Sequence, residues 1–320
     1  MPVELLAHQM GDMARDERQV VDRESSILAA GGFTLVELLV VVGVLALLLG
    51  VLVPALAQAR RAARSLVGAS RQRQVVLAVN LYATDHEGRY PESVATAAML
   101  GRTWRWQEPR MMKACSPRAD NYRCSMAAYL RSYLPKAVIL SCPSSPRTYN
   151  YAEESWRAGE QWDNPDTSYT DDSVQSSFCF YWNYIGYLPE QERPFVGPQT
   201  DDGRRKGSSL LIGDYFGFNH WRSPEAFGSC ERLPHAEVAA ETSSSPPFWS
   251  QVLRRRMDRT NIQIKLRAGF VDGHVETYRP ADTAILEVAD DLDGTTPAFS
   301  GLGVGAGEFY IPRDAIGRRP

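Results

Sequence analysis

The sequence predicts an α+β protein in which one long N-terminal helix is followed by an antiparallel sheet domain. Two observations support this prediction. A helical pattern continues without a break from residue 33 to about residue 84, and beyond residue 88 the chain alternates between short segments of high β propensity and long polar loops. Because the apolar face of such a sheet has to be covered, we expect the C-terminal half of the helix to pack against it.

The first half of the predicted helix is an apolar run without charge. Residues 38–59, about 22 in all, carry no charged side chain and are mostly Leu, Val or Ala. Roughly 20 residues cross a 30 Å hydrocarbon core at 1.5 Å per residue, so the run has the length of a membrane span. A signal peptide fits less well because its apolar core is shorter and follows a basic segment. Glu37 stands at the head of the run, and because a carboxylate deep in a bilayer is costly, we expect it to lie at the interface or to have a partner.

The second half of the predicted helix is amphipathic. Its apolar residues recur at spacings of three, four and seven, as a helix with one buried face requires; they are Leu66, Val67, Val75, Val76, Val79 and Tyr82. The polar residues 85–88, which end in Gly88, and the nearby Pro91 predict the end of the helix. The complete helix has about 50 residues and a length of roughly 75 Å. Proline and glycine weaken a helix, so we expect kinks at Pro54 and at Gly43 and Gly50.

The domain that follows is predicted to contain short strands. The predicted strands are residues 137–142, 177–187, 208–215, 262–266 and 268–278, with Asp272-Gly273 as a hairpin turn in the last of them. Polar segments at residues 153–172, 199–206 and 241–247 are predicted to be surface loops.

A motif at the start of the helix resembles a known processing signal. The residues Gly31-Gly32-Phe33-Thr34-Leu35-Val36-Glu37, followed by the apolar run, resemble the N-terminal cleavage and methylation motif of type IV prepilins and type II secretion pseudopilins. The resemblance implies that a membrane aspartyl peptidase cuts after Gly32 and then methylates the new amine of Phe33. It makes Glu37 the fifth mature residue and puts Pro54 at the twenty-second, where the family often carries a proline.

In this family, the acid corresponding to Glu37 faces the N-terminal ammonium of a neighbouring subunit. Inside a helical filament of low dielectric an unpaired carboxylate is costly, so such a pair would set the stagger between subunits. The alternative is a carboxylate that stays near the lipid headgroups.

Two further segments are similar to the large prepilin-like proteins abundant in planctomycete-type bacteria. One is the end of the predicted helix, residues 74–91, and the other is Gly269-Phe270-Val271-Asp272-Gly273-His274-Val275-Glu276. Some members also carry a histidine about ten residues before the aspartate. Ile262 stands at that place here, so the fuller motif is absent.

The resemblance implies four regions and a location. They are a leader peptide (1–32), a transmembrane and assembly helix (33–59), its amphipathic continuation (60–87) and an extracytoplasmic α+β domain (88–320). The chain is then a single-pass protein of the inner, cytoplasmic membrane that enters a periplasmic or surface filament. Its partners are the prepilin peptidase, other pilin or pseudopilin subunits, and the membrane.

Two features depart from the family. Family leaders are typically short and basic, whereas this one is long and has six acidic residues against three arginines. Five arginines also follow the apolar run, at positions 60, 61, 64, 71 and 73. By the positive-inside rule alone they favour a cytoplasmic C-terminal domain, which is the opposite of the family topology.

The leading functional hypothesis is a structural subunit of a type II secretion pseudopilus or a type IV pilus-like filament. The alternative is a membrane-anchored binding module that is processed in the same way but never polymerises, and whose loops at Trp104, Trp106, Trp156 and Trp162 contact a saccharide or a partner. A net charge of −3 with dispersed basic residues argues against nucleic-acid binding. We expect no enzyme activity, because the histidines are scattered and there is no Gly-x-Ser-x-Gly motif.

The cysteines and one acidic turn are candidate structural sites. In an extracytoplasmic compartment disulfides are expected, and the candidate pairs are Cys115 with Cys124 and Cys142 with Cys179; buried free thiols are the alternative. The acidic residues Asp290, Asp291 and Asp293, in a turn closed by Gly294, are a candidate Ca²⁺ site, because several carboxylates in a tight loop supply oxygen ligands. The alternative is a solvated acidic turn without an ion, and no other cofactor is expected.

Overall fold

The computed structural model describes residues 34–100, 108–114, 124–145, 150–166, 173–201, 207–218, 259–260, 262, 264–298 and 307–317. The chain divides into two compact units, residues 1–60 and residues 61–320. One helix, α2 (Leu35–Asp85, 51 residues), begins in the first unit and ends in the second.

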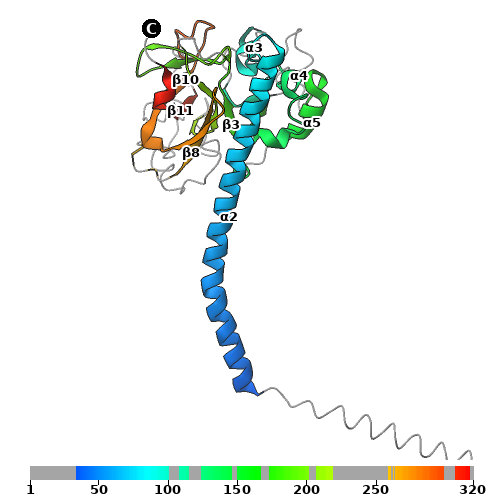
Figure 1. Ribbon diagram of the computed structural model, residues 1–320, viewed down its shortest axis with the longest axis vertical. Coiled ribbons are helices and arrows are strands. Elements are labelled where there is room, and N and C mark those ends of the chain that lie inside the picture. Colours follow the sequence, from blue (N-terminus) through cyan, green and yellow to red (C-terminus); the bar gives the residue numbers. More distant parts are fainter. Residues whose placement is uncertain are drawn as a thin grey trace, which may run out of the picture. The chain divides into compact units, whose positions relative to one another are not determined.

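The long helix predicted from the sequence is confirmed. Figure 1 shows α2 as one long helix. It ends one residue beyond the predicted position. Its end is fixed by Gly88, whose φ of +76° is the left-handed conformation that glycine adopts at little cost. The Gly88 N–H donates to the carbonyl of Ala83 over 2.8 Å, which satisfies one of the last carbonyls of the helix.

The second unit contains antiparallel sheets, so the α+β prediction is also confirmed. A four-stranded sheet has the order β3-β6-β8-β9, a five-stranded sheet the order β5-β4-β10-β11-β7, and β1 pairs with β2. The strands are β1 (Met111–Lys113), β2 (Val174–Gln175), β3 (Phe178–Phe180), β4 (Ile185–Leu188), β5 (Arg193–Val196), β6 (Leu210–Asp214), β7 (Gly217–Phe218), β8 (Leu266–Phe270), β9 (Val275–Tyr278), β10 (Thr283–Val288) and β11 (Glu308–Pro312).

The other helical elements are short. They are α3 (Val94–Leu100), α4 (Ala127–Leu130), η1 (Ala137–Leu140), α5 (Ala152–Ala158), η2 (Gly159–Gln161), η5 (Pro280–Asp282) and η6 (Arg313–Ile316).

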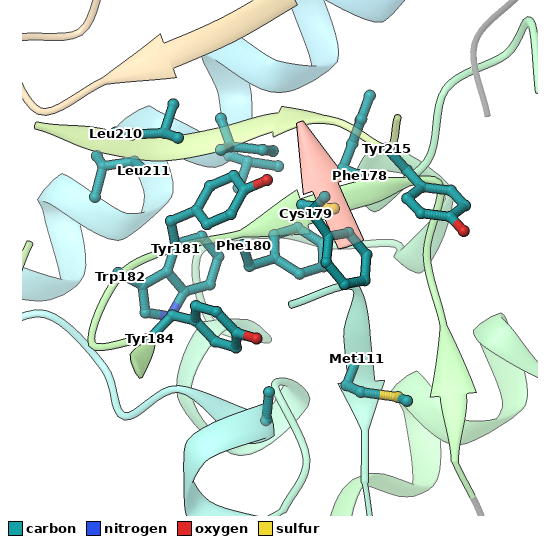
Figure 2. Packing of buried hydrophobic residues seen from close by; sticks show 14 of the residues in the cluster. Met111, Phe178, Cys179, Phe180, Tyr181, Trp182, Tyr184, Leu210, Leu211 and Tyr215 are labelled. Carbon is teal, nitrogen blue, oxygen red and sulfur yellow. The ribbon is translucent and has the colours of Figure 1, made fainter. Parts of the chain in front are cut away.

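The core of the second unit is rich in aromatic side chains. Phe178, Phe180, Tyr181, Trp182 and Tyr184 come from β3 and the turn after it, and all are buried. Figure 2 shows these rings gathered beside Leu210 and Leu211 of β6 and Met111 of β1. Large rings bury much apolar area per residue, so this short segment supplies a large part of the core.

The C-terminal half of α2 covers the four-stranded sheet, as the amphipathic pattern predicts. Val75, Val76 and Val79 are buried, whereas Leu66 (73% exposed) and Val67 (44% exposed), which were predicted to lie on the same face, are not. A Cβ atom at Gly269 of β8 would lie 2.8 Å from Cγ2 of Val76, so glycine is required for this close approach. The Asn80 side chain donates to the carbonyl of Val271 over 3.1 Å, just beyond the end of β8.

Several smaller predictions need correction. Residues 137–142 are not a strand: Ala137 and Leu140 are buried three residues apart and Val138 is 43% exposed, which is the periodicity of the 3₁₀ helix η1. Residues 177–187 form two strands instead of one, because Asn183 adopts a positive φ of 52° between them. The segment 153–172, predicted to be a loop, contains α5 and η2, since Trp156 is buried in the core.

The predicted hairpin at Asp272-Gly273 is confirmed, because β8 and β9 pair across it and Gly273 has a φ of +90°. The predicted strand at 208–215 is also confirmed as β6. Among the described residues of 262–266, only Leu266 belongs to a strand.

Candidate functional site

The apolar surface of the first half of α2 is the most unusual feature of the described chain. Its large hydrophobic side chains are exposed all the way round, from Leu35 (79% exposed) to Leu56 (45% exposed). Among the described helices, α2 is the one that is long and apolar enough to cross a membrane. None of the residues in its most apolar 18-residue segment is buried. Its length and composition are compatible with a single membrane span and also with a signal sequence.

The predicted assembly residue Glu37 caps the N-terminus of this helix. The Thr34 N–H and hydroxyl both donate to Oε2 of Glu37, over 2.9 Å and 2.8 Å. The Glu37 N–H in turn donates to the Thr34 hydroxyl over 3.2 Å. This reciprocal arrangement is a capping box, which satisfies backbone donors that have no partner within the helix.

The Thr-x-x-Glu pattern that indicates a capping box is present in the sequence, but Glu37 was predicted only to pair between subunits or to lie near the lipid headgroups. The structure therefore adds a role within the chain. The processing residues Gly32 and Phe33 lie outside the described residues. Pro54 lies inside the continuous helix α2.

A buried polar network holds the second half of α2 to the four-stranded sheet. This network was not predicted from the sequence. The Gln72 side chain donates to Oδ1 of Asp214 over 2.7 Å. Oδ2 of Asp214 pairs with Nε of Arg267 at 3.4 Å and accepts the Arg267 N–H over 3.1 Å. The Arg267 guanidinium also donates to the carbonyl of Ser65 on α2. Gln72 and Asp214 are almost completely buried.

The only sequence signal for this network was Gln72 itself, a polar residue on the apolar face of the helix. The network joins α2 to β6 and β8 through directional contacts, which fixes the position of the helix along the sheet.

The candidate calcium site is not formed. The described residues contain no group of three His, Cys, Asp or Glu side chains placed to hold a metal ion, and this includes Asp290, Asp291 and Asp293. Asp291 instead closes its own turn, because its carboxylate accepts the N–H of Thr295 over 2.9 Å and the hydroxyl of Thr295 over 3.0 Å. Partial burial raises the pKa of Asp291, but the hydrogen bonds from Thr295, Thr296 and Gly294 outweigh it and the pKa is lowered overall.

The predicted disulfide between Cys142 and Cys179 is wrong. Both residues are buried thiols. Burial raises the pKa of the Cys179 thiol far above its usual value, which suppresses the reactive thiolate. Cys124 does take part in a disulfide, and its partner lies outside the described residues, as does Cys115.

A cleft of about 470 Å³ lies in the second unit beside α5. Its lining residues are Arg71, Val138, Ser141, Cys142, Pro143, Tyr151, Ala152, Glu153 and Glu154. Two charged residues of the cleft make hydrogen bonds to its backbone. Arg71 donates to the carbonyl of Ser141 over 2.8 Å, and Glu153 accepts the N–H of Val138 over 2.9 Å. The predicted ligand contacts Trp156 and Trp162 are buried in the core, and Trp104 and Trp106 lie outside the described residues.

No protein-family model, curated protein or solved structure matches the chain. The features that indicate a function are therefore the exposed apolar helix, its capped N-terminus and its attachment to the sheets.

Proposed function

We propose that the chain is a pilin-like structural subunit. In this proposal a prepilin peptidase cleaves it after Gly32 and methylates Phe33, and the mature N-terminal helix then assembles with other subunits into a type II secretion pseudopilus or a type IV pilus-like filament. The domain that contains the sheets lies outside the cytoplasm. The single observation that carries the proposal is the division of α2 into a fully exposed apolar half and a half packed on antiparallel sheets.

The exposed apolar half supports both membrane anchoring and assembly. An apolar surface this extensive is unfavourable in water, and burying it contributes about 25 cal/mol per Å². A bilayer covers it before assembly, and the helices of neighbouring subunits cover it in a filament. Because one surface serves both environments, transfer from membrane to filament leaves no large apolar area exposed to water.

The capping box supports a dual role for Glu37. Both hydrogen bonds from Thr34 go to Oε2, and Oε1 accepts no hydrogen bond from the described residues. In our proposal Oε1 remains able to accept from the Phe33 ammonium of a neighbouring subunit while Oε2 keeps its own helix capped. A pair of this kind is favourable in an apolar filament core only when both charges are satisfied.

Processing is tested by the mature N-terminus. The full chain is expressed with and without a prepilin peptidase, and the N-terminal peptide is identified by mass spectrometry. The expected result is N-methyl-Phe33 only when the peptidase is present. An intact leader, or cleavage within the apolar run as in a secretory signal peptide, would overturn the proposal.

Assembly is tested with two substitutions in the capping box. Glu37→Ala removes the carboxylate, whereas Thr34→Ala removes the capping hydroxyl and keeps the carboxylate. We expect Glu37→Ala to remain in the membrane but to be lost from the sheared filament fraction, and Thr34→Ala to be retained in filaments. Equal losses for the two variants would mean that Glu37 acts only as a helix cap.

A second candidate function is a membrane-anchored binding module that does not polymerise, and the cleft beside α5 favours it. A cleft of about 470 Å³ is within the size range of small-ligand sites. Fractionation separates the two functions: wild-type chain found only in the membrane, and never in sheared filaments, supports the binding module.

A further inference from the structure

We propose that Arg60, Arg61 and Arg64 of α2 form a basic collar that binds the phosphate groups of anionic phospholipids where the helix leaves the bilayer. This inference rests on the membrane anchoring in the proposed function. It assigns a role to arginines that the processing motif does not explain.

The spacing along α2 places these arginines at headgroup depth. Twenty-five helical residues, 35–59, precede Arg60, and at 1.5 Å per residue they extend about 37 Å. The hydrocarbon core is about 30 Å thick, and the bilayer with its headgroups about 40–45 Å. Each headgroup layer is thus about 5–8 Å thick. A helix that enters the core just after Glu37 leaves it about 20 residues later, near residue 58, which brings Arg60 and Arg61 into the headgroup layer, and Arg64 lies about 6 Å beyond Arg60.

The charges of the collar are not balanced by acidic residues on the same helix. Between Glu37 and Asp85, α2 contains no Asp or Glu. Arg60, Arg61 and Arg64 are exposed, and none of them belongs to an ion pair among the described residues.

Arg64 is four residues from Arg60 and three from Arg61, which places it beside each of them on the helix surface. Three adjacent like charges repel one another, so a bound anion would relieve the repulsion. The planar guanidinium group matches a phosphate with two parallel hydrogen bonds.

The sheet domain does not cover the collar. Arg61 precedes Gly68 by seven residues and Val75 by fourteen, so it lies on nearly the same face of the helix. Gly68 and Val75 are buried on that face, whereas Arg61 is exposed. The packed surface thus ends before Arg61, and the continuity of the arginines with the apolar run favours lipid over a protein partner. Each Arg near an anionic membrane surface contributes about 1 kcal/mol of attraction.

Lipid retention in nanodiscs tests the proposal. The full chain is reconstituted into nanodiscs with equal parts of phosphatidylcholine and phosphatidylglycerol, and the lipids that remain bound after release are counted by native mass spectrometry. We expect the wild type to prefer phosphatidylglycerol by about tenfold. The triple variant R60Q/R61Q/R64Q should show almost no preference.

The matched control is R73Q/R89Q/K136Q, which removes three positive charges from exposed positions outside the collar. It should retain the wild-type preference. The proposed lipid binding would be wrong if this control lost the preference for phosphatidylglycerol, or if R60Q/R61Q/R64Q kept it.

Two other outcomes separate this inference from the proposed function. A chain that does not insert into nanodiscs at all would contradict the membrane anchoring and the collar together. A chain that inserts without preferring phosphatidylglycerol, but whose R60Q/R61Q/R64Q variant forms fewer cross-linked dimers, would show that the arginines contact a second copy of the chain. That result would overturn the collar and leave the proposed function in place.

Discussion

The two halves of α2 are both rich in Leu, Val and Ala, but they differ in what covers them. In residues 35–60 the large apolar side chains are exposed on all sides. In residues 61–85 one face is buried, and its buried residues are Gly68, Gln72, Val75, Val76, Ala78, Val79 and Ala83. The opposite face retains exposed residues such as Leu77 (59% exposed) and Leu81 (46% exposed).

The comparison shows that the arrangement of apolar residues around a helix, and not only their number, determines its environment. A single apolar stripe can be satisfied by one sheet, as in the second half. A helix that is apolar all round needs an apolar medium or several neighbouring helices. The first half of α2 therefore cannot be satisfied by the four-stranded sheet alone.

The largest expected difference between the halves is the cost of a buried charge. Val79→Asp places a carboxylate at a position that is 0% exposed and should destabilise the second unit by about 5 kcal/mol. Val44→Asp changes a residue that is 51% exposed in the first half. It should leave the unfolding midpoint of the sheets unchanged and weaken retention in the membrane. Near-UV circular dichroism in detergent measures the first effect, and membrane fractionation the second.

If Val44→Asp lowered the unfolding midpoint as much as Val79→Asp, the first half of α2 would contribute to the stability of the sheet domain, and the contrast between the halves would be wrong.

The next largest effect is expected in the polar network of the second half. Asp214→Ala leaves the buried Arg267 without its carboxylate and should cost about 3–5 kcal/mol. Gln72→Leu removes the hydrogen bonds from the Gln72 amide to Asp214 and to the carbonyl of Arg267, keeps the ion pair, and should cost about 1–2 kcal/mol. Chemical denaturation of the two single variants measures the difference. Replacing Arg267 by Met in the Asp214→Ala background should recover part of the loss, and no recovery would mean that the ion pair is not the main contribution.

The sequence was sufficient to predict the features that depend on local patterns. The length and end of α2, the strand at 208–215 and the hairpin at Asp272-Gly273 all follow from hydrophobic periodicity and turn residues. Thr34 and Glu37 also form a local pattern, and the capping box was predictable although we did not predict it.

The failures concern contacts between distant parts of the chain. The pairing of Gln72 with Asp214 spans 142 positions, and no local pattern indicates it. The same applies to Cys142 and Cys179, which were paired because the bond would tie two predicted strands together. Residues Ala137–Leu140 instead form a 3₁₀ helix, and both cysteines remain thiols. Even four cysteines allow three different disulfide pairings, so spacing does not determine connectivity.

Glycine-to-alanine substitutions in the two halves should have smaller and different effects on the free energy of unfolding. A Cβ atom at Gly68 would lie 2.9 Å from Nη1 of Arg267, whereas one at Gly50 would have no neighbour within 4 Å. Alanine favours a helix by up to about 1 kcal/mol over glycine. In Gly68→Ala the Arg267 side chain has to move away from Ser65, so we expect a net loss of about 1 kcal/mol. Gly50→Ala should leave the midpoint of the sheet domain unchanged in the same denaturation assay.

The smallest expected effect lies at the C-terminal end of α2. The Tyr133 hydroxyl donates to Asp85, the last residue of the helix, over 2.7 Å. This hydrogen bond is the main cause that raises the pKa of Tyr133 to about 12. A tyrosine in the unfolded chain has a pKa of about 10, so the folded state holds its proton more tightly. The stabilisation is therefore complete below about pH 10 and is lost as the pH rises through 12.

Thermal unfolding of Tyr133→Phe over the alkaline range measures this contribution. Between pH 10 and about pH 12 the variant should lose less stability than the wild type, and below pH 9 the two curves should run parallel. Asp85→Asn removes the charged acceptor and keeps the hydroxyl, so it should reduce the alkaline loss in the same direction. If neither variant changed the alkaline slope, the bond between Tyr133 and Asp85 would not contribute to stability, and the second half of α2 would be held by its buried face and by the polar network around Asp214.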